Sequence, residues 1–156
     1  MTYQEWKAKF VDNAGENDII TSENSKAVEK DVHYIGKIDR DIYKCVTDDL
    51  QSDDVIITEK QVEHIKQHHP NDYERYFKYA ESIIADPDYI LEANRPDTAF
   101  LLKHIKENNK NYEIILRLKT SKDPAEYKNS IITFLKVEEK RYQRYLRTKK
   151  ILYKKE

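Results

Sequence analysis

The stretch V-E-H-I-K-Q-H-H-P at 62–70 holds three of the chain's five histidines, His64, His68 and His69. An unperturbed imidazole titrates at about pH 6.5, so neighbouring histidines suit proton transfer in catalysis. His64 and His68 are four residues apart and could instead hold a metal ion on one helix face. A third alternative is structural: one imidazole packs at the helix end and the others face water.

The residues around this stretch predict where its helix begins and ends. Thr58 has the residue type of an N-cap, and Gln61 three positions later completes a capping-box pattern. Pro70 predicts the end of the helix, because proline disfavours helical geometry in the residue before it. We therefore expect a helix that starts after Thr58 and ends at Pro70.

Helical geometry separates the three histidines. At about 100° per residue, Val62, Ile65 and His69 fall on one face, which we expect to be buried. His64 and His68 fall side by side on a flanking and more exposed stripe. The pattern therefore pairs His64 with His68 and turns His69 inward.

A metal site at His64 and His68 would need a third ligand, from His104, Glu63 or an aspartate elsewhere. Cys45 is the only cysteine, which excludes an intrachain disulfide and a cysteine-based zinc site. The chain has two glycines and no glycine-rich pattern that could cradle a phosphate. The sequence therefore offers no pattern for a bound cofactor, and the metal alternative at His64 and His68 stays open at this point.

Composition bounds the fold and its partners. Charged residues make up 37% and hydrophobic residues 38% of the 156 residues, with 12 tyrosines, which predicts one domain with a lean, aromatic core. Residues 1–99 carry 12 Lys+Arg and 22 Asp+Glu, whereas residues 100–156 carry 16 and 7. The basic part suits an anionic partner such as nucleic acid, although its charges could also pair within the fold. No apolar run approaches the roughly 20 residues of a membrane span, so we expect no membrane partner.

Short runs of hydrophobic residues predict the remaining elements. Residues 1–33 are polar and indicate an arm or linker with a short amphipathic helix at its start. Strands are expected at Y-I-G-K-I-D and V-I-I-T, and a further helix from about 72 to 85. An antiparallel meander is predicted over Y-I-L-E-A, T-A-F-L-L-K-H-I, Y-E-I-I-L-R-L-K and S-I-I-T-F-L-K-V. The basic helix E-E-K-R-Y-Q-R-Y-L-R follows, and K-I-L-Y-K-K is a candidate edge strand. In this order the predicted helices come first and the predicted sheet follows, which is the pattern of the α+β class.

The order of these segments resembles a family of phage-encoded nuclease-like domains, in the group named for barnase, EndoU, colicin E5 and D, and RelE. The matching stretches cover about residues 34–154 and are I-I-T-E-K-Q-V-E-H-I-K-Q-H-H-P, D-P-D-Y-I, T-A-F-L-L-K, I-I-L-R-L-K, N-S-I-I-T and R-Y-L-R-T-K-K-I-L-Y-K. The H-I-x-x-x-H-P element followed by D-P-D-Y-I is the most specific part. The stretch T-Y-Q-E-W-K at 2–7 also resembles the end of phage minor head proteins of the Mu F type, which can carry toxin domains at their C-terminus.

The first resemblance implies an α+β fold of the barnase and RelE kind. In it, N-terminal helices pack on a four- to five-stranded antiparallel sheet, and a basic C-terminal helix follows. It also implies metal-independent RNA cleavage, usually as a toxin. We expect residues 34–156 to form this nuclease domain. We expect residues 1–33 to be an arm, the remnant of a larger phage head protein.

The family pattern selects other histidines than helix geometry does. His64 and His69 match the two histidines of H-I-x-x-x-H-P, and His68 does not. Both criteria favour His64, so we predict that it performs acid–base chemistry. His69 is a second catalytic candidate that could equally be a structural anchor, and we expect His68 to be dispensable.

Metal-independent RNA cleavage uses the substrate's own 2′-hydroxyl as nucleophile, so the site must move protons and stabilise a phosphorane-like charge. We predict Arg117 for that charge, because alternation in I-L-R-L-K places it on the strand face opposite Leu116 and Leu118. Ser130 or Thr133 could donate a hydrogen bond to a phosphate oxygen. The structural alternatives stay open: Arg117 could pair with a carboxylate, and both hydroxyl residues suit strands and turns.

Cations and one aromatic side chain are assigned to RNA binding. Arginines of the basic helix would contact backbone phosphates, and Tyr142 or Tyr145 could stack on a base. The predicted RNA-binding residues are Lys103, Arg141, Arg144, Tyr145 and Arg147. A solvated helix face for the arginines and a core position for the tyrosines are the alternatives.

We therefore predict a phage or prophage endoribonuclease toxin domain that cleaves RNA, with tRNA among the candidate substrates. We expect it in the bacterial cytoplasm or carried in a virion, with a cognate immunity protein as a candidate partner. Two rival classes remain. One is an inactive nuclease-like module that binds a capsid or host protein, and the other is a metal-dependent hydrolase built on His64 and His68.

Overall fold

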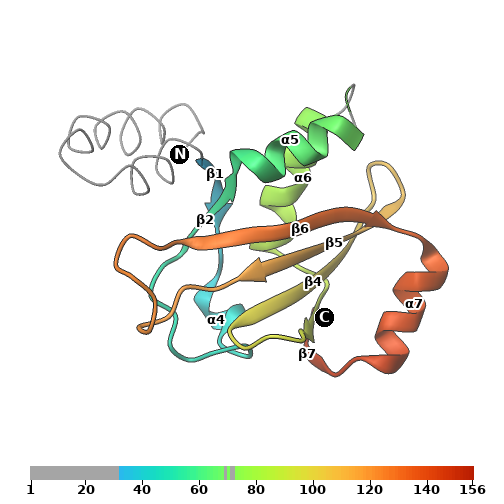
Figure 1. Ribbon diagram of the computed structural model, residues 1–156. Coiled ribbons are helices and arrows are strands. Elements are labelled where there is room, and N and C mark those ends of the chain that lie inside the picture. Colours follow the sequence, from blue (N-terminus) through green and yellow to red (C-terminus); the bar gives the residue numbers. More distant parts are fainter. Residues whose placement is uncertain (1–31, 69, 71–72) are drawn as a thin grey trace.

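Seven strands of the described residues form one sheet in the order β1-β2-β6-β5-β4-β3-β7 (Figure 1). The computed structural model describes residues 32–68, 70 and 73–156. The strands in this part of the chain are β1 (Val32–Lys37), β2 (Asp54–Thr58), β3 (Tyr89–Glu92), β4 (Thr98–Ile105), β5 (Lys110–Arg117), β6 (Asn129–Val137) and β7 (Ile151–Lys154). Its helices are α4 (Arg40–Tyr43), α5 (Glu59–His68), α6 (Tyr73–Ala85) and α7 (Glu139–Thr148).

The predicted meander and the α+β class are confirmed. Strands β3, β4, β5 and β6 follow one another in the chain and pair as antiparallel neighbours in the sheet. The basic helix α7 follows β6, and the last strand β7 lies at the sheet edge beside β3.

The sheet is larger than the four to five antiparallel strands that the sequence predicts, so that prediction is wrong. Strand β1 pairs with β2 at one edge, and β7 adds a seventh strand at the other. Strand β2 runs parallel to β6 through the pairs Val55↔Asn129 and Ile56↔Ser130. A short hydrophobic run indicates a strand, but packing between distant segments decides which neighbour the strand takes and in which direction.

The placement of the helices also differs from the prediction. Strands β1 and β2 precede α5 and α6, so the helices do not come before the sheet. The amphipathic helix predicted at the start of the chain lies outside the described residues. The N-cap prediction is confirmed, because the backbone N–H of Gln61 donates to Thr58 Oγ1 at 3.3 Å and α5 begins at Glu59.

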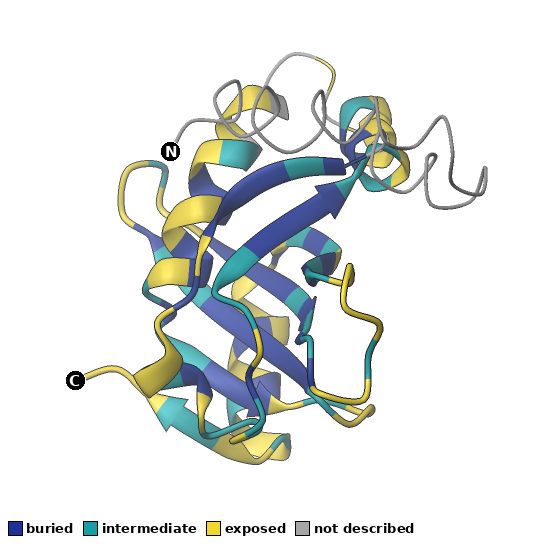
Figure 2. Ribbon diagram, turned by 90° about the vertical axis from the view of Figure 1, so that its left-hand side faces the viewer, coloured by how far each residue is buried: buried dark blue, intermediate teal, exposed yellow. Residues whose placement is uncertain are grey.

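Different helices cover the two faces of the sheet. Val62 of α5 and Ile83 of α6 share one core cluster with Leu101 of β4. Phe100 and Leu102, the chain neighbours of Leu101, belong to a second cluster with two tyrosines of α7. Successive side chains of a strand point to opposite faces, so α5 and α6 cover one face and α7 covers the other. Figure 2 shows the strands buried between helices whose outer surfaces are exposed. Burial of each large side chain stabilises the fold by about 1.5–3 kcal/mol.

Candidate active site

An open groove in the described part of the chain lies between α5 and β6 and has a volume of about 1010 Å³. Its position follows from the parallel ladder. Strand β2 pairs with β6 only at Asn129 and Ser130, and two residues later β2 ends at Thr58 and the chain turns into α5. A helix therefore lies beside the rest of β6 where a strand could have continued, and the space between them stays open.

His64 and His68 line this groove from α5. Both are exposed, and their ring centroids are 4.5 Å apart in an edge-on arrangement with an interplanar angle of 66°. The prediction that they lie side by side on an exposed stripe is therefore confirmed. Val62 and Ile65 are buried on the helix face that this stripe flanks, as predicted. His69 lies outside the described residues, so its predicted inward position stays a prediction.

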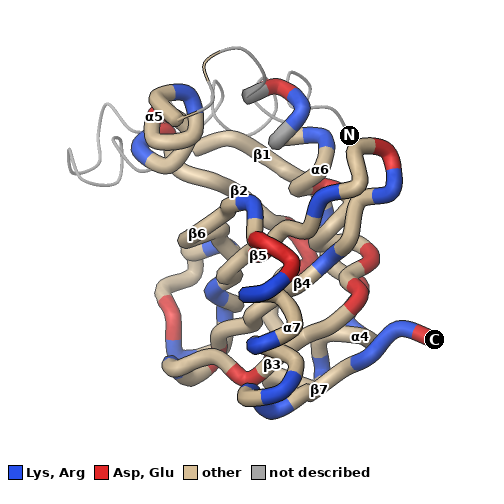
Figure 3. The backbone as a smooth tube through the Cα atoms, turned by 90° about the vertical axis from the view of Figure 1, so that its right-hand side faces the viewer, with Lys and Arg blue, Asp and Glu red and all other residues tan. Residues whose placement is uncertain are grey.

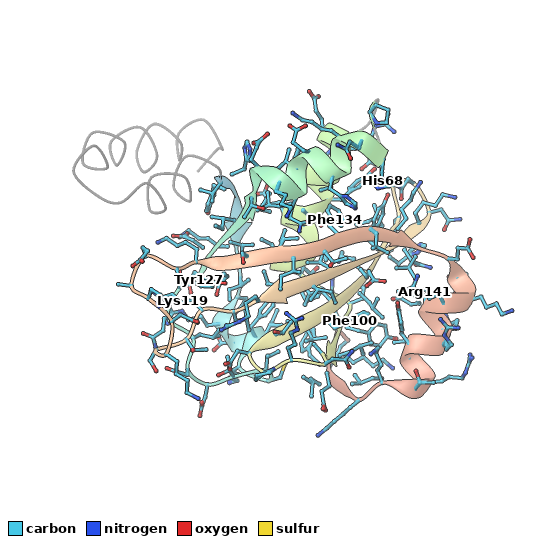
Figure 4. All side chains as sticks on the ribbon, viewed as in Figure 1. His68, Phe100, Lys119, Tyr127, Phe134 and Arg141 are labelled. Atoms are coloured by element: carbon cyan, nitrogen blue, oxygen red, sulfur yellow. The ribbon has the colours of Figure 1, made fainter. Side chains whose placement is uncertain are left out.

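Strand β6 supplies the opposite wall. Thr133 is half-buried and Lys136 is exposed, and both line the groove together with Lys60 of α5. Figure 4 shows His68 on α5 and Phe134 on β6 on the two sides of this space. The groove thus combines imidazole, hydroxyl and ammonium groups from two elements that are far apart in the sequence.

A side-chain hydrogen bond attaches the start of α5 to β1. His33 of β1 bonds the carboxylate of Glu59, the first residue of α5. This hydrogen bond lowers the pKa of Glu59 below its ordinary value. A carboxylate is also favourable at a helix N-terminus, so the pair helps to fix the helix that carries His64. Sequence analysis did not single out His33, because nothing in the sequence pairs it with a residue 26 positions away.

Arg117 lies away from the groove. Its neighbours Leu116 and Leu118 are buried in the core under α5 and α6, so Arg117 is on the other sheet face, as alternation predicts. Its Nη2 donates to Asp123 Oδ1 at 3.0 Å, and its guanidinium lies 5.9 Å from the centroid of the Tyr127 ring. Arg117 therefore holds the loop after β5, which is the carboxylate pairing that the sequence left open.

The two predicted hydroxyl residues are separated by the structure. Ser130 pairs in register with Arg117 at the end of the sheet that carries the 118–128 loop. Thr133 pairs with Ile115 beyond an irregularity in the ladder and reaches the groove. Of the predicted catalytic residues that the structure describes, His64 and Thr133 are brought together, whereas Arg117 and Ser130 are not.

Lys103 is held by carboxylates. Its Nζ donates to the backbone oxygen of Asp86 at 2.6 Å and lies 3.5 Å from Asp88 Oδ1. Only 12% of its side chain is exposed. Lys103 thus anchors the D-P-D turn between α6 and β3, and the groove does not include it.

The predicted RNA-binding helix α7 uses some of its side chains for packing. Tyr145 is buried; its hydroxyl donates to Glu113 Oε1 at 3.1 Å and accepts from Arg141 Nε at 2.6 Å. Arg144 and Arg147 are exposed. Figure 3 shows basic segments along α7 and near the C-terminus. Arg144 and Arg147 therefore remain open to a ligand, whereas Tyr145 has the core position that was its structural alternative.

Glu113 is a buried carboxylate that sequence analysis missed. It is 5% exposed on β5, and this burial raises its pKa. A glutamate inside the apolar run Y-E-I-I-L-R was a usable signal, because alternation places it on the same face as Arg117.

Two further properties concern the described residues only. They contain no group of three or more His, Cys, Asp or Glu side chains arranged to hold a metal ion, so His104 and Glu63 do not complete a site with His64 and His68. None of their helices is both long enough and apolar enough to span a membrane.

The domain is thus of the α+β class, and an exposed imidazole pair on α5 lines one groove together with Thr133, Lys60 and Lys136. Residues 30–154 match the family described as phage-Barnase-EndoU-ColicinE5/D-RelE like nuclease2. The match spans most of the chain, so the chain belongs to this family, and the resemblance is confirmed. The family supports nuclease activity in general. No curated protein and no solved structure is similar enough to give a match.

Proposed function

We propose that the domain is a metal-independent endoribonuclease toxin domain of phage origin and that the α5–β6 groove is its active site. The observation that carries the proposal is the presence of His64 and Thr133 in one groove, from two different elements. The groove volume of about 1010 Å³ is ample for a nucleotide. Membership of a nuclease family supports cleavage of a phosphodiester bond.

In the proposed reaction the 2′-hydroxyl oxygen of RNA attacks the adjacent phosphorus and the bond to the 5′-oxygen breaks. The products are a 2′,3′-cyclic phosphate and a free 5′-hydroxyl. His64 accepts the proton of the attacking hydroxyl, and a second group returns a proton to the leaving oxygen. His69, the other histidine of the family motif, is the candidate for that second transfer on the basis of the motif alone.

The charge that develops on the phosphate oxygens needs donors within the groove. Lys60 and Lys136 line it and supply ammonium groups, and Thr133 can donate its hydroxyl hydrogen. We assign this stabilisation to these residues and not to Arg117, because Arg117 lies outside the groove and already pairs with Asp123.

The test uses two oligonucleotides of the same sequence, incubated with purified protein in EDTA. One is RNA, and the other carries a 2′-deoxy sugar at the cut position. We expect cleavage of the RNA alone, with a 2′,3′-cyclic phosphate at the new end. Cleavage of the deoxy substrate would contradict the 2′-hydroxyl mechanism, and activity that requires a metal ion would contradict metal independence.

A cellular test addresses the toxin assignment. Expression of the wild-type domain in bacteria should arrest growth and release RNA fragments, whereas the His64→Ala variant should do neither. Sequencing of RNA ends would show whether tRNA is cut. A folded wild-type protein that is harmless and cuts none of several RNAs would favour the inactive binding module.

A further inference from the structure

A second hollow adjoins the groove at the end of β6. It has a volume of about 700 Å³ and lies between the β4–β5 hairpin and the start of α7. Lys136 lines both the groove and this hollow. An RNA strand that ran from the groove along β6 would pass the exposed ammonium group of Lys136 and then reach the second hollow.

The hollow contains a pre-oriented imidazole. His104 Nδ1 lies 2.8 Å from Asn111 Oδ1, and Asn111 Nδ2 donates to Glu139 Oε2 at 2.6 Å. The carboxylate of Glu139 can only accept a hydrogen bond, so the amide nitrogen of Asn111 must point toward it. The amide oxygen of Asn111 therefore points toward the His104 imidazole. That oxygen only accepts, so His104 carries its hydrogen on Nδ1 and presents Nε2 as the free nitrogen. Among the described residues, no hydrogen-bond partner of Nε2 is found.

The charged groups that face His104 in this hollow are balanced. Lys110 and Lys136 bring positive charge, and Glu138 and Glu139 bring negative charge. Glu139 is already bound by Gln143 and Asn111, which together lower its pKa. A lining with balanced charges suits a neutral polar group that has both hydrogen-bond donors and acceptors. The ammonium group of Lys136 lies between the groove and the hollow, so it suits a phosphate that connects the two.

We propose that the hollow beside His104 is a binding subsite for the nucleotide that follows the one held in the α5–β6 groove. The nucleobase lies in the hollow against the His104 imidazole, and the connecting phosphate lies on Lys136. Imidazole rings stack on unpaired bases, and such stacking tolerates any base sequence. The inference rests on the proposed function, because the groove must hold RNA for the hollow to hold its neighbour.

The subsite predicts that affinity depends on substrate length. The probes are a fluorescein-labelled 2′-O-methyl mononucleotide, which can fill the groove alone, and a fluorescein-labelled 2′-O-methyl hexanucleotide, which can also reach the hollow; neither can be cleaved through the 2′-oxygen. Fluorescence anisotropy gives their affinities for the full chain. We expect the wild type to bind the hexanucleotide more tightly than the mononucleotide, and His104→Ala to weaken only hexanucleotide binding, by about fivefold or more. Lys136→Ala should weaken hexanucleotide binding, and the matched control Lys122→Ala, an exposed lysine outside both hollows, should leave it unchanged.

Thermal unfolding of each variant distinguishes lost binding from lost folding. If His104→Ala fails to fold, Lys110→Ala replaces it, since this exposed residue lines the same hollow. A wild type that cleaves RNA but binds both lengths equally would overturn the subsite and leave the proposed function intact. A wild type that neither cleaves RNA nor binds either probe would overturn both.

Discussion

The α5–β6 groove and the contact between α7 and the sheet both hold titratable side chains, but in opposite states. In the groove, His64 and His68 are exposed, and no described side chain hydrogen-bonds their rings. Under α7, the buried carboxylate of Glu113 accepts from Tyr145, which in turn accepts from Arg141. An open imidazole can exchange protons with a ligand, whereas a satisfied buried network fixes a helix in place. From this difference we infer that the groove performs the chemistry and that the α7 contact stabilises the fold.

The largest expected effect is on catalysis by the groove. His64→Ala should lower kcat/KM for RNA by about 10²–10⁴-fold, the usual contribution of a group that transfers a proton. Its thermal stability should equal that of the wild type, because the side chain is exposed. The matched control is His68→Ala, the adjacent exposed imidazole, which should keep nearly full activity. Equal losses in the two variants would mean that the pair acts as a unit.

The next effect concerns stability at the α7 contact. Tyr145→Phe removes the hydroxyl that bonds Glu113 and leaves a buried carboxylate without this donor. We expect the free energy of unfolding to fall by about 1–3 kcal/mol, measured by urea denaturation at neutral pH. RNA cleavage by the folded variant should be unchanged. A stable variant with lost cleavage would instead move the catalytic assignment to this face of the sheet.

A smaller effect is expected from the hydroxyl in the groove. Thr133→Val keeps the shape of the side chain and removes its donor, so kcat should fall about tenfold, the value of roughly one hydrogen bond. Thr133→Ser retains the donor and should restore most of that rate. The comparison uses initial rates at saturating RNA. If valine and serine behave alike, the hydroxyl has no part in the reaction.

The smallest effect is a pH dependence under α7. Burial raises the pKa of Glu113 in the folded state, so between its ordinary and raised values the folded protein binds more protons than the unfolded chain. The free energy of unfolding therefore decreases as pH rises through this window. Glu113→Gln removes this decrease, so the variant should gain stability relative to the wild type as pH rises above the ordinary pKa of a glutamate, about 4.3. Parallel stability curves would show that the carboxylate titrates normally.

Local features of the fold were predictable from the sequence. Thr58 and Gln61 marked the start of α5, and the spacing of Val62 and Ile65 placed His64 on an exposed stripe. The four consecutive β-runs predicted the antiparallel meander. Each of these rests on residues close together in the chain, where periodicity and capping act directly.

The features that the sequence did not predict depend on distant partners. The groove exists because β2 pairs in parallel with the first two residues of β6, and no local pattern contains that pairing. Arg117 was assigned to phosphate charge, and the structure places Asp123 beside it instead. Burial of Glu113 likewise depends on the packing of α7 over β5, which is separated from it by a strand and a loop.

The most direct test compares the two regions on one substrate. Initial rates of RNA cleavage in EDTA are measured for the wild type, His64→Ala and Glu113→Gln, with folding of each confirmed by thermal unfolding. The account predicts that the wild type and Glu113→Gln cleave at similar rates and that His64→Ala is inactive. Full activity of His64→Ala together with an inactive, folded Glu113→Gln would contradict it and place the chemistry under α7.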